Sequence, residues 1–195
     1  MMANTAKYDR DTVVDSAMLL FWEKGFHGTS TRDLQQAVNL RPGSFYAAFG
    51  SKEQLFREAL HCYSKKSNEL LQQSLSNSPS ILEGIEAFIR AIVLGQRDNV
   101  PSDMCMLVKT IAELTDEQAE LVAESKALLK KTEYHISELL SEAQAAGELK
   151  ADIDCADLAK KVIIQLMGLR TYLRSSDDEP AVERLVTEIF SSSKI

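Results

Sequence analysis

Cysteine, proline and long apolar runs are all scarce in this 195-residue chain, and each scarcity excludes a class of protein. Three cysteines, an odd number without metal-ligand spacing, argue against a disulfide framework and favour reduced thiols in a cytoplasm. No stretch approaches the ~20 apolar residues of a membrane span. The first seven residues also lack the apolar core of a signal peptide. We therefore expect a cytoplasmic protein without a membrane partner.

Signatures of catalysis and of cofactor binding are missing as well. The three histidines, His27, His61 and His135, are scattered, and none lies in an HExxH sequence. The chain also contains neither a GxSxG sequence nor a phosphate-binding loop. We therefore predict that the protein is not an enzyme and has no catalytic residue, resident metal or cofactor.

Residues with high helix propensity are abundant. Only four prolines interrupt the chain, Leu, Ala, Glu, Lys and Gln are plentiful, and 45% of the residues are hydrophobic, enough to bury a core. Apolar residues at helical spacing predict an all-α fold of about nine helices. After the first fifty residues, helices are expected at 52–75, 80–93, 104–112, 115–147, about 154–174 and about 180–191, with a loop at 98–102.

The first fifty residues contain the most informative pattern. A first helix with apolar residues at helical spacing stops at Gly25, and a second helix is expected at 31–38. Asn39 tolerates the left-handed turn that follows. Pro42 and Gly50 then bound a helix of about two turns, which is too short to be stable alone. Helix, tight turn and short helix form the helix-turn-helix pattern, whose second helix enters the DNA major groove.

These residues resemble the TetR (tetracycline-repressor-like) family of bacterial transcription regulators. The resemblance covers roughly residues 10–60 and is carried by Gly25-Phe26, by the run 29–34 and by the run 40–55. It implies a three-helix DNA-binding domain at 6–60, with the motif at about 29–50, and a larger helical ligand-binding and dimerisation domain at 61–195. Asn39 replaces the usual turn glycine. Ala47-Ala48 replace residues that are often bulkier, which leaves the operator sequence open.

Candidate DNA contacts follow from the side-chain chemistry and from the resemblance. Arg41 either binds guanine O6 and N7 with two hydrogen bonds or lies along a phosphate. Tyr46 resembles the family's exposed tyrosine, whose hydroxyl meets a phosphate. Lys52 begins a helix, where the dipole disfavours a cation unless it serves a phosphate. Thr29 is equally suited to be a helix cap. The predicted set is Thr29, Thr31, Arg32, Arg41, Gly43, Ser44, Tyr46, Ala47 and Lys52, whereas Phe45 and Phe49 are expected to pack inward.

The net charge of −7 is unevenly distributed. Residues 1–60 hold seven basic and seven acidic side chains, whereas the rest of the chain holds fifteen and twenty-two. The excess acid therefore lies outside the predicted DNA-binding part. Between residues 41 and 57, three bases face one acid, which suits a few phosphate contacts.

The C-terminal helices are expected to carry the dimer interface and the inducer site. Wide apolar stripes on 154–174 and 180–191 predict a homodimer, with a monomer as the alternative. The resemblance implies a repressor on a palindromic double-stranded DNA operator, released by an unknown small molecule or electrophile. Candidate ligand-binding or sensing residues are Phe88, Met104, Cys105, Met106, Lys109, Leu128 and Met167. The phenylalanine, the leucine and the three methionines among them are equally plausible as plain core.

Cys105 is the candidate sensor among them. It lies at the start of an apolar helix, where unpaired N–H groups stabilise a thiolate, and Lys109 follows four positions later. A small buried hydrophobe is the alternative interpretation. Cys62 and Cys155 have no charged partner in the sequence pattern and are interpreted as structural.

Two other functions remain open. The small Ala47 and Ala48 and the acidic C-terminal part favour an interaction protein that keeps the helix-turn-helix shape but has lost specific DNA binding. A ligand-dependent activator is the second alternative.

Overall fold

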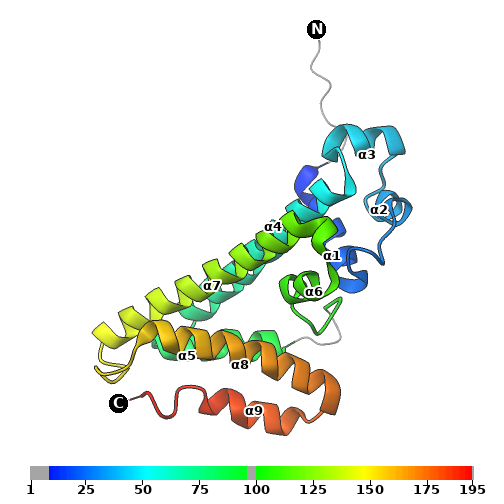
Figure 1. Cartoon of the computed structure of the whole chain (residues 1–195). Coiled ribbons are helices and arrows are strands. Elements are labelled where there is room, and N and C mark those ends of the chain that lie inside the picture. Colours follow the sequence, from blue (N-terminus) through cyan, green and yellow to red (C-terminus); the bar gives the residue numbers. More distant parts are fainter. Residues whose placement is uncertain (1–8, 96–99, 195) are drawn as a thin grey trace. The chain divides into compact units, whose positions relative to one another are not determined.

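The computed structural model describes residues 9–95 and 100–194. In these residues the chain forms nine α-helices, one 3₁₀ turn (η2, Asp116–Gln118) and an isolated β-bridge, so the predicted all-α fold is confirmed. Residues 6–8 of the predicted first domain and residues 98–99 of the predicted loop lie outside the described residues. The helices (Figure 1) are α1 (Arg10–Lys24), α2 (Thr31–Ala37), α3 (Pro42–Phe49), α4 (Lys52–Ser76), α5 (Ile81–Val93), α6 (Met106–Glu113), α7 (Ala119–Ala145), α8 (Cys155–Ser176) and α9 (Glu179–Glu188).

The chain divides into two compact units that interleave along the sequence. The first unit runs up to Lys65 and also includes Met106–Lys126, so it holds α1 to α3, the first part of α4, α6 and the start of α7. The second unit holds Lys66–Cys105 and the residues from Ala127 onward. Helix α6 therefore belongs to the same compact unit as the helix-turn-helix segment.

The core of the first unit is built around three phenylalanine rings from α1, the turn after it and α4. Phe56 contacts Phe21 and Phe26 edge-on, with ring centroids 4.7 Å and 5.0 Å away. All three side chains are buried. Because edge-to-face contact is a favourable geometry for aromatic pairs, this cluster fixes α1 against α4.

The second unit has one continuous apolar core shared by the second part of α4 and by α5, α7, α8 and α9. Helix α5 packs on α8 and α9, which also contact each other (Figure 1). The side chain of Ser80 and the carboxylate of Glu148 accept backbone N–H groups in the first turn of α5. These bonds satisfy donors that have no partner within the helix.

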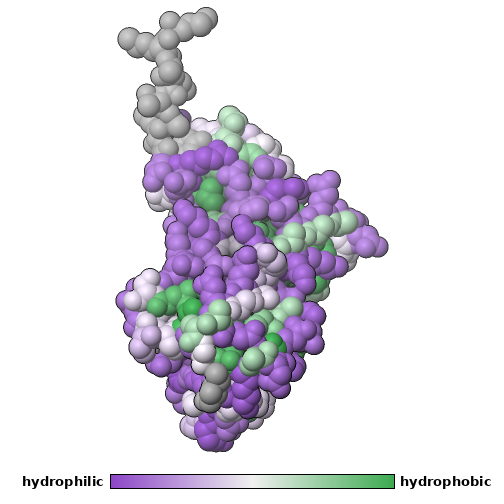
Figure 2. Space-filling model, turned by 90° about the vertical axis from the view of Figure 1, so that its left-hand side faces the viewer, coloured by the Kyte–Doolittle hydropathy of each residue, from purple (hydrophilic) through white to green (hydrophobic). Residues whose placement is uncertain are grey.

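No helix within 9–95 or 100–194 is both long and apolar enough to cross a bilayer. The face of the molecule in Figure 2 is mostly covered by hydrophilic side chains, and hydrophobic ones reach the surface in separate patches. Two of the exposed large apolar side chains, Ile164 and Tyr172, belong to α8, and a third, Leu185, belongs to α9.

Candidate nucleic-acid interface

Helix α3 has one buried side and one open side. Pro42 begins it, and it ends at Gly50, whose φ is +72° and whose N–H donates to the Tyr46 carbonyl. Phe45 and Phe49 are 0% and 2% exposed, which confirms that they pack inward. Since successive residues turn by about 100° in an α-helix, Gly43 and Ala47 lie on the side opposite Phe45.

The open side of α3 gathers most of the predicted DNA contacts. Gly43, Ser44, Tyr46 and Ala47 are all exposed, and a Cβ added to Gly43 would meet no atom within 4 Å. Arg41 precedes the helix, is exposed, and makes no capping hydrogen bond with its side chain. Gly43, Ser44 and Ala47 are small, and Arg41 and Tyr46 lie beside them. The edges of the base pairs in a DNA groove can therefore come close to this surface.

Helix α2 and the turn after it are built as the sequence predicts. Ser30 and Asp33 form a capping box, and hydrogen bonds from Ser30 hold the pKa of the Asp33 carboxyl below its usual value. Asn39 has a φ of +52°, so it makes the left-handed turn into α3. Arg32 is exposed and Thr31 is half-buried at the start of α2.

Thr29, predicted as a DNA contact, lies inside the protein. Its side chain is 0% exposed, and its hydroxyl donates to the Gly25 carbonyl at 2.7 Å. The adjacent Ser30, and not Thr29, provides the side-chain cap of α2. Thr29 therefore holds the turn between α1 and α2 from inside, and its hydroxyl is not available to DNA.

Lys52 lies at the start of α4, with its ammonium over an aromatic ring. The Nζ atom is 4.2 Å from the centroid of the Phe26 ring. Burial lowers the pKa of Lys52 from its ordinary value. The lysine thus braces α4 against the turn after α1, a role that its sequence position did not indicate.

Two charged side chains of α6 hold the end of α1 and the turn that follows. Lys109 Nζ donates to the carbonyls of Trp22 and Glu23, 2.7 Å and 3.1 Å away, where the helix dipole favours a cation. The Glu113 carboxylate accepts the backbone N–H groups of Phe26 and His27, at 3.0 Å and 2.7 Å. The conformation of the turn before α2 therefore depends on α6.

The Glu113 contact predicts a local loss of order when its charge is removed. In Glu113→Gln the amide oxygen replaces only one carboxylate acceptor, which leaves the other N–H facing an NH₂ group. We expect a loss of ~1–2 kcal/mol in the free energy of unfolding. Urea denaturation measures this loss, and amide exchange should show faster opening at Phe26 and His27.

Glu117→Gln is the matched control, because Glu117 is an exposed acid in the segment just after α6. It should leave both readouts unchanged. If Glu113→Gln and Glu117→Gln behave alike, the two short contacts to the turn contribute nothing to stability.

The candidate ligand residues are distributed between core and half-buried positions. Phe88, Met106 and Leu128 are buried, whereas Met104, Cys105, Lys109 and Met167 are half-buried. Cys105 directly precedes α6, which begins at Met106 and not at 104 as predicted, and the Lys109 ammonium is engaged with the carbonyls of α1. None of these seven residues lines the hollow described next.

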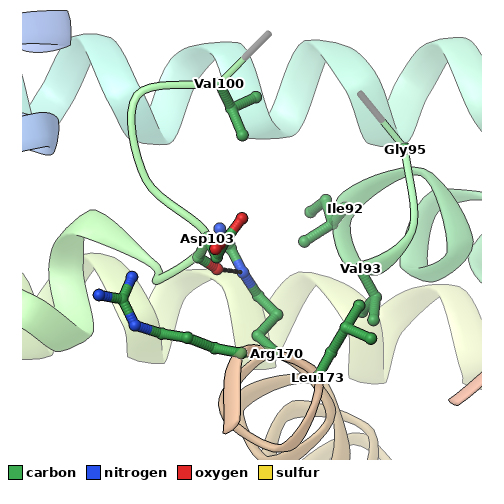
Figure 3. A pocket seen from close by; sticks show the side chains of 8 residues that line it. Ile92, Val93, Gly95, Val100, Asp103, Arg170 and Leu173 are labelled. Atoms are coloured by element: carbon green, nitrogen blue, oxygen red, sulfur yellow. Dashed lines mark hydrogen bonds between the residues drawn. The ribbon is translucent and has the colours of Figure 1, made fainter. Parts of the chain in front are cut away.

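A hollow in the second unit is lined by other residues (Figure 3). The space inside it is about 10 Å³, room for about one water molecule. Arg170, only 8% exposed, donates from Nε to the backbone oxygen of Asp103 at 2.6 Å. The lining residues are Ile92, Val93, Gly95, Val100, Asp103, Arg170, Leu173 and Arg174.

Comparisons with known proteins agree with this geometry. Residues 13–59 match the family of bacterial regulatory proteins, tetR family, and residues 82–189 match the tetracyclin repressor-like C-terminal domain. The HTH-type transcriptional repressor ComR of Escherichia coli (strain K12) is 27% identical over 165 residues, covering 83% of this chain and 79% of ComR.

Solved structures of the same family superimpose over nearly the whole chain. A cysteine-substituted form of the TetR family regulator CifR, bound to 26-bp double-strand operator DNA, is 30% identical, with a TM-score of 0.84 and coverage of 95% of this chain and 97% of CifR. A TetR family regulator from Cytophaga hutchinsonii, 19% identical, has the same fold, with a TM-score of 0.87 and coverage of 100% and 99%. These relatives are transcriptional regulators and not enzymes. With both of its domains matched, the chain belongs to the TetR family of DNA-binding transcriptional regulators.

Proposed function

We propose that this regulator is a homodimeric repressor that binds a palindromic operator and is released from it by a small molecule. The observation that carries the proposal is the open side of α3, where Gly43, Ser44, Tyr46 and Ala47 are exposed while Phe45 and Phe49 anchor the helix. The repressor role is supported by the names of relatives, which include the repressor ComR and the negative regulator IcaR of Staphylococcus aureus.

The proposed division of labour follows the chain order. Residues 6–60 bind DNA, and residues 61–195 carry the dimer interface and the ligand site. Arg41 and Ser44 read base edges, while Thr31, Arg32, Tyr46 and Lys52 meet the DNA backbone. Thr29 is left out because it is buried.

The proposed partner of α8 and α9 is a second copy of the chain. Ile164, Gly168 and Tyr172 recur every four residues on α8, so they share one face of that helix. Ile164 is 67% exposed and Tyr172 and Leu185 are each 45% exposed, although all three are large and apolar. A Cβ on Gly168 would meet nothing within 4 Å, so a second helix has room to approach closely there. Two half-sites read by such a dimer lie about 34–36 Å apart.

The proposed inducer acts on the second unit. Its hollow has apolar walls from Ile92, Val93 and Leu173 and two arginines, but it has room for only about one water molecule, so a small molecule must widen it on binding. Cys105 remains the proposed site of attack for an electrophilic inducer, since it is half-buried directly before α6. Either inducer must favour one arrangement of the dimer over the other, typically by ~1–3 kcal/mol.

The experiment that tests the proposal is selection of duplexes by the reduced, full-length protein from a random pool. We expect an enriched palindrome, bound in fluorescence anisotropy with a log–log salt slope of several units. A pool that stays random over all rounds overturns the proposal in favour of a helix-turn-helix-shaped interaction protein. Enrichment of a sequence without two-fold symmetry overturns the dimeric mode of binding.

Arg41 gives a residue-level prediction for the same assay. Arg41→Ala is expected to relax base preference at one position in each half-site, because a bidentate arginine discriminates its guanine by ~1–3 kcal/mol. Selection with the variant, compared with the parent protein, measures this change directly.

Tyr46→Phe is the matched comparison for Arg41. It should weaken binding to all DNA sequences to the same extent and leave the selected motif unchanged, since a phosphate contact does not distinguish one base from another. If Arg41→Ala also weakens all duplexes uniformly, the arginine is a phosphate contact and the base-reading assignment is wrong.

A further inference from the structure

Arg10, the first residue of α1, makes two contacts to the far end of α3 and a third to α4. Its Nη1 donates to the Ala48 carbonyl at 3.0 Å, and its Nη2 meets the Glu58 carboxylate at 2.6 Å. Its guanidinium also lies over the Phe49 ring, 4.6 Å from the centroid. We propose that Arg10 is a positioning residue that sets the orientation of α3 on the DNA, and that it does so through these contacts and not by touching DNA.

The need for such a residue follows from the length of α3. A helix of eight residues leaves half of its carbonyls without a partner inside the helix. Gly50 and Ser51 donate their N–H groups to the carbonyls of Tyr46 and Phe49. Arg10 supplies the donor for Ala48 and places a positive charge at the C-terminal end, where the helix dipole favours it.

The three contacts of Arg10 come from two different helices. Ala48 and Phe49 belong to α3, whereas Glu58 belongs to α4 and is itself half-buried. A single planar guanidinium thus joins the starts of α1 and α4 to the end of α3. Lysine cannot reproduce this arrangement, because one ammonium does not give two parallel donors and a flat face at once.

The rival role for Arg10 is a direct phosphate contact, since its side chain is 49% exposed. The two roles predict opposite results for Arg10→Lys, which keeps the positive charge, and for Glu58→Ala, which removes the acid that Arg10 contacts. The inference rests on the proposed function of α3 as the helix that contacts DNA. The probe is the duplex enriched by the parent protein, bound to full-length variants in fluorescence anisotropy across a salt series.

We expect Arg10→Lys and Arg10→Ala to raise the Kd alike, by about tenfold, which equals ~1.4 kcal/mol. The log–log salt slope should stay at the parent value, because no phosphate contact is lost. A phosphate contact predicts that Arg10→Lys restores most of the affinity and that Arg10→Ala lowers the slope by about 0.9. That result would overturn the proposal.

Removing the partner acid gives the sharper comparison. Glu58→Ala deletes a negative charge near the DNA-binding helix, so electrostatics alone predicts equal or tighter binding. The positioning role predicts weaker binding and non-additivity with Arg10→Ala, since both changes break the same contact. Glu53→Ala is the matched control, an exposed acid on the same helix that should not weaken binding. Tighter binding by Glu58→Ala contradicts the proposal.

Two further measurements keep the outcomes separate. Thermal unfolding of each variant shows whether lost affinity reflects lost folding, and affinities are compared at a temperature where all variants are folded. Tyr46→Phe and Arg41→Ala belong to the same series. If neither weakens binding, the proposed interface fails, and the Arg10 inference fails with it. If both weaken binding while Arg10→Lys matches the parent protein, only the Arg10 inference fails.

Discussion

Replacing Ile164 by arginine is expected to turn the protein into a monomer that has lost most of its operator affinity. Ile164 is 67% exposed on α8, in line with Gly168 and Tyr172, so the proposed dimer buries it. An arginine there would have to be desolvated in the interface, which costs several kcal/mol. Because a dimer engages two half-sites at once, losing the second engagement should weaken binding by about 100-fold or more.

Sedimentation gives the molecular mass of the Ile164→Arg variant, and anisotropy compares duplexes with one and two half-sites. The parent protein should prefer two half-sites strongly, and the variant should not. Leu19→Arg is the control for mass, since Leu19 is also an exposed large apolar residue but lies on α1. A dimeric Ile164→Arg variant would falsify the proposed interface.

Phe56→Ala is expected to cause the largest loss of stability in the first unit. Phe56 is 1% exposed and contacts Phe21 and Phe26 edge-on, so its removal leaves a cavity between α1 and α4. Large-to-alanine changes at such sites cost ~3–5 kcal/mol. That is a large share of the ~5–15 kcal/mol that stabilises a typical domain.

Urea denaturation with amide exchange in α3 checks the expectation for Phe56. Phe56→Leu is the matched variant, because it keeps most of the apolar volume and loses mainly the ring contacts, which are worth ~0.5–1.5 kcal/mol each. Equal losses for the two variants would contradict the cavity argument. Exchange in α3 should accelerate more in Phe56→Ala than in Phe56→Leu, because Phe45 and Phe49 of α3 are buried in the same compact unit as Phe56.

The helices of this protein were predictable because their signals are local. Gly25, Asn39 and Gly50 all have the positive φ that a helix stop or a tight turn requires. The side chain of Asp154 caps α8, which begins at Cys155, one residue after the predicted start at about 154. Each of these features depends on neighbours close in sequence, so composition and spacing are sufficient to find them.

The contacts that position the candidate interface were not predictable in the same way. The hydrogen bond between Phe26 and Glu113 joins residues 87 positions apart in the sequence, and the one between Arg10 and Ala48 joins residues 38 positions apart. Cys62, interpreted as lacking a charged partner, donates to Asp15 on α1 at 2.9 Å. Helical periodicity shows which face of a helix is apolar, but it does not tell which polar residue of another helix that face will meet.

Thr29 shows how one residue type supports two interpretations. A threonine just before a helix is a possible cap, a DNA contact or an internal brace, and these roles share the same sequence pattern. Its burial decides among them, because the hydroxyl is bonded to Gly25 inside the protein. Arg170 is the reverse case. Arginine is mostly exposed in proteins, so its sequence position does not predict a buried side chain, yet Arg170 is buried beside the hollow.

Positions 25 and 113 are expected to vary together in evolution. A Cβ at position 25 would lie 2.4 Å from the Glu113 Oε2 atom, and the backbone there has a φ of +78° that side chains rarely adopt. A homologue with a larger residue than glycine at position 25 must therefore have a shorter or differently oriented side chain at position 113. That homologue then lacks both hydrogen bonds to the turn. Covariation between these two sites, 88 residues apart, would thus be evidence that α6 contacts the turn before α2 throughout the family.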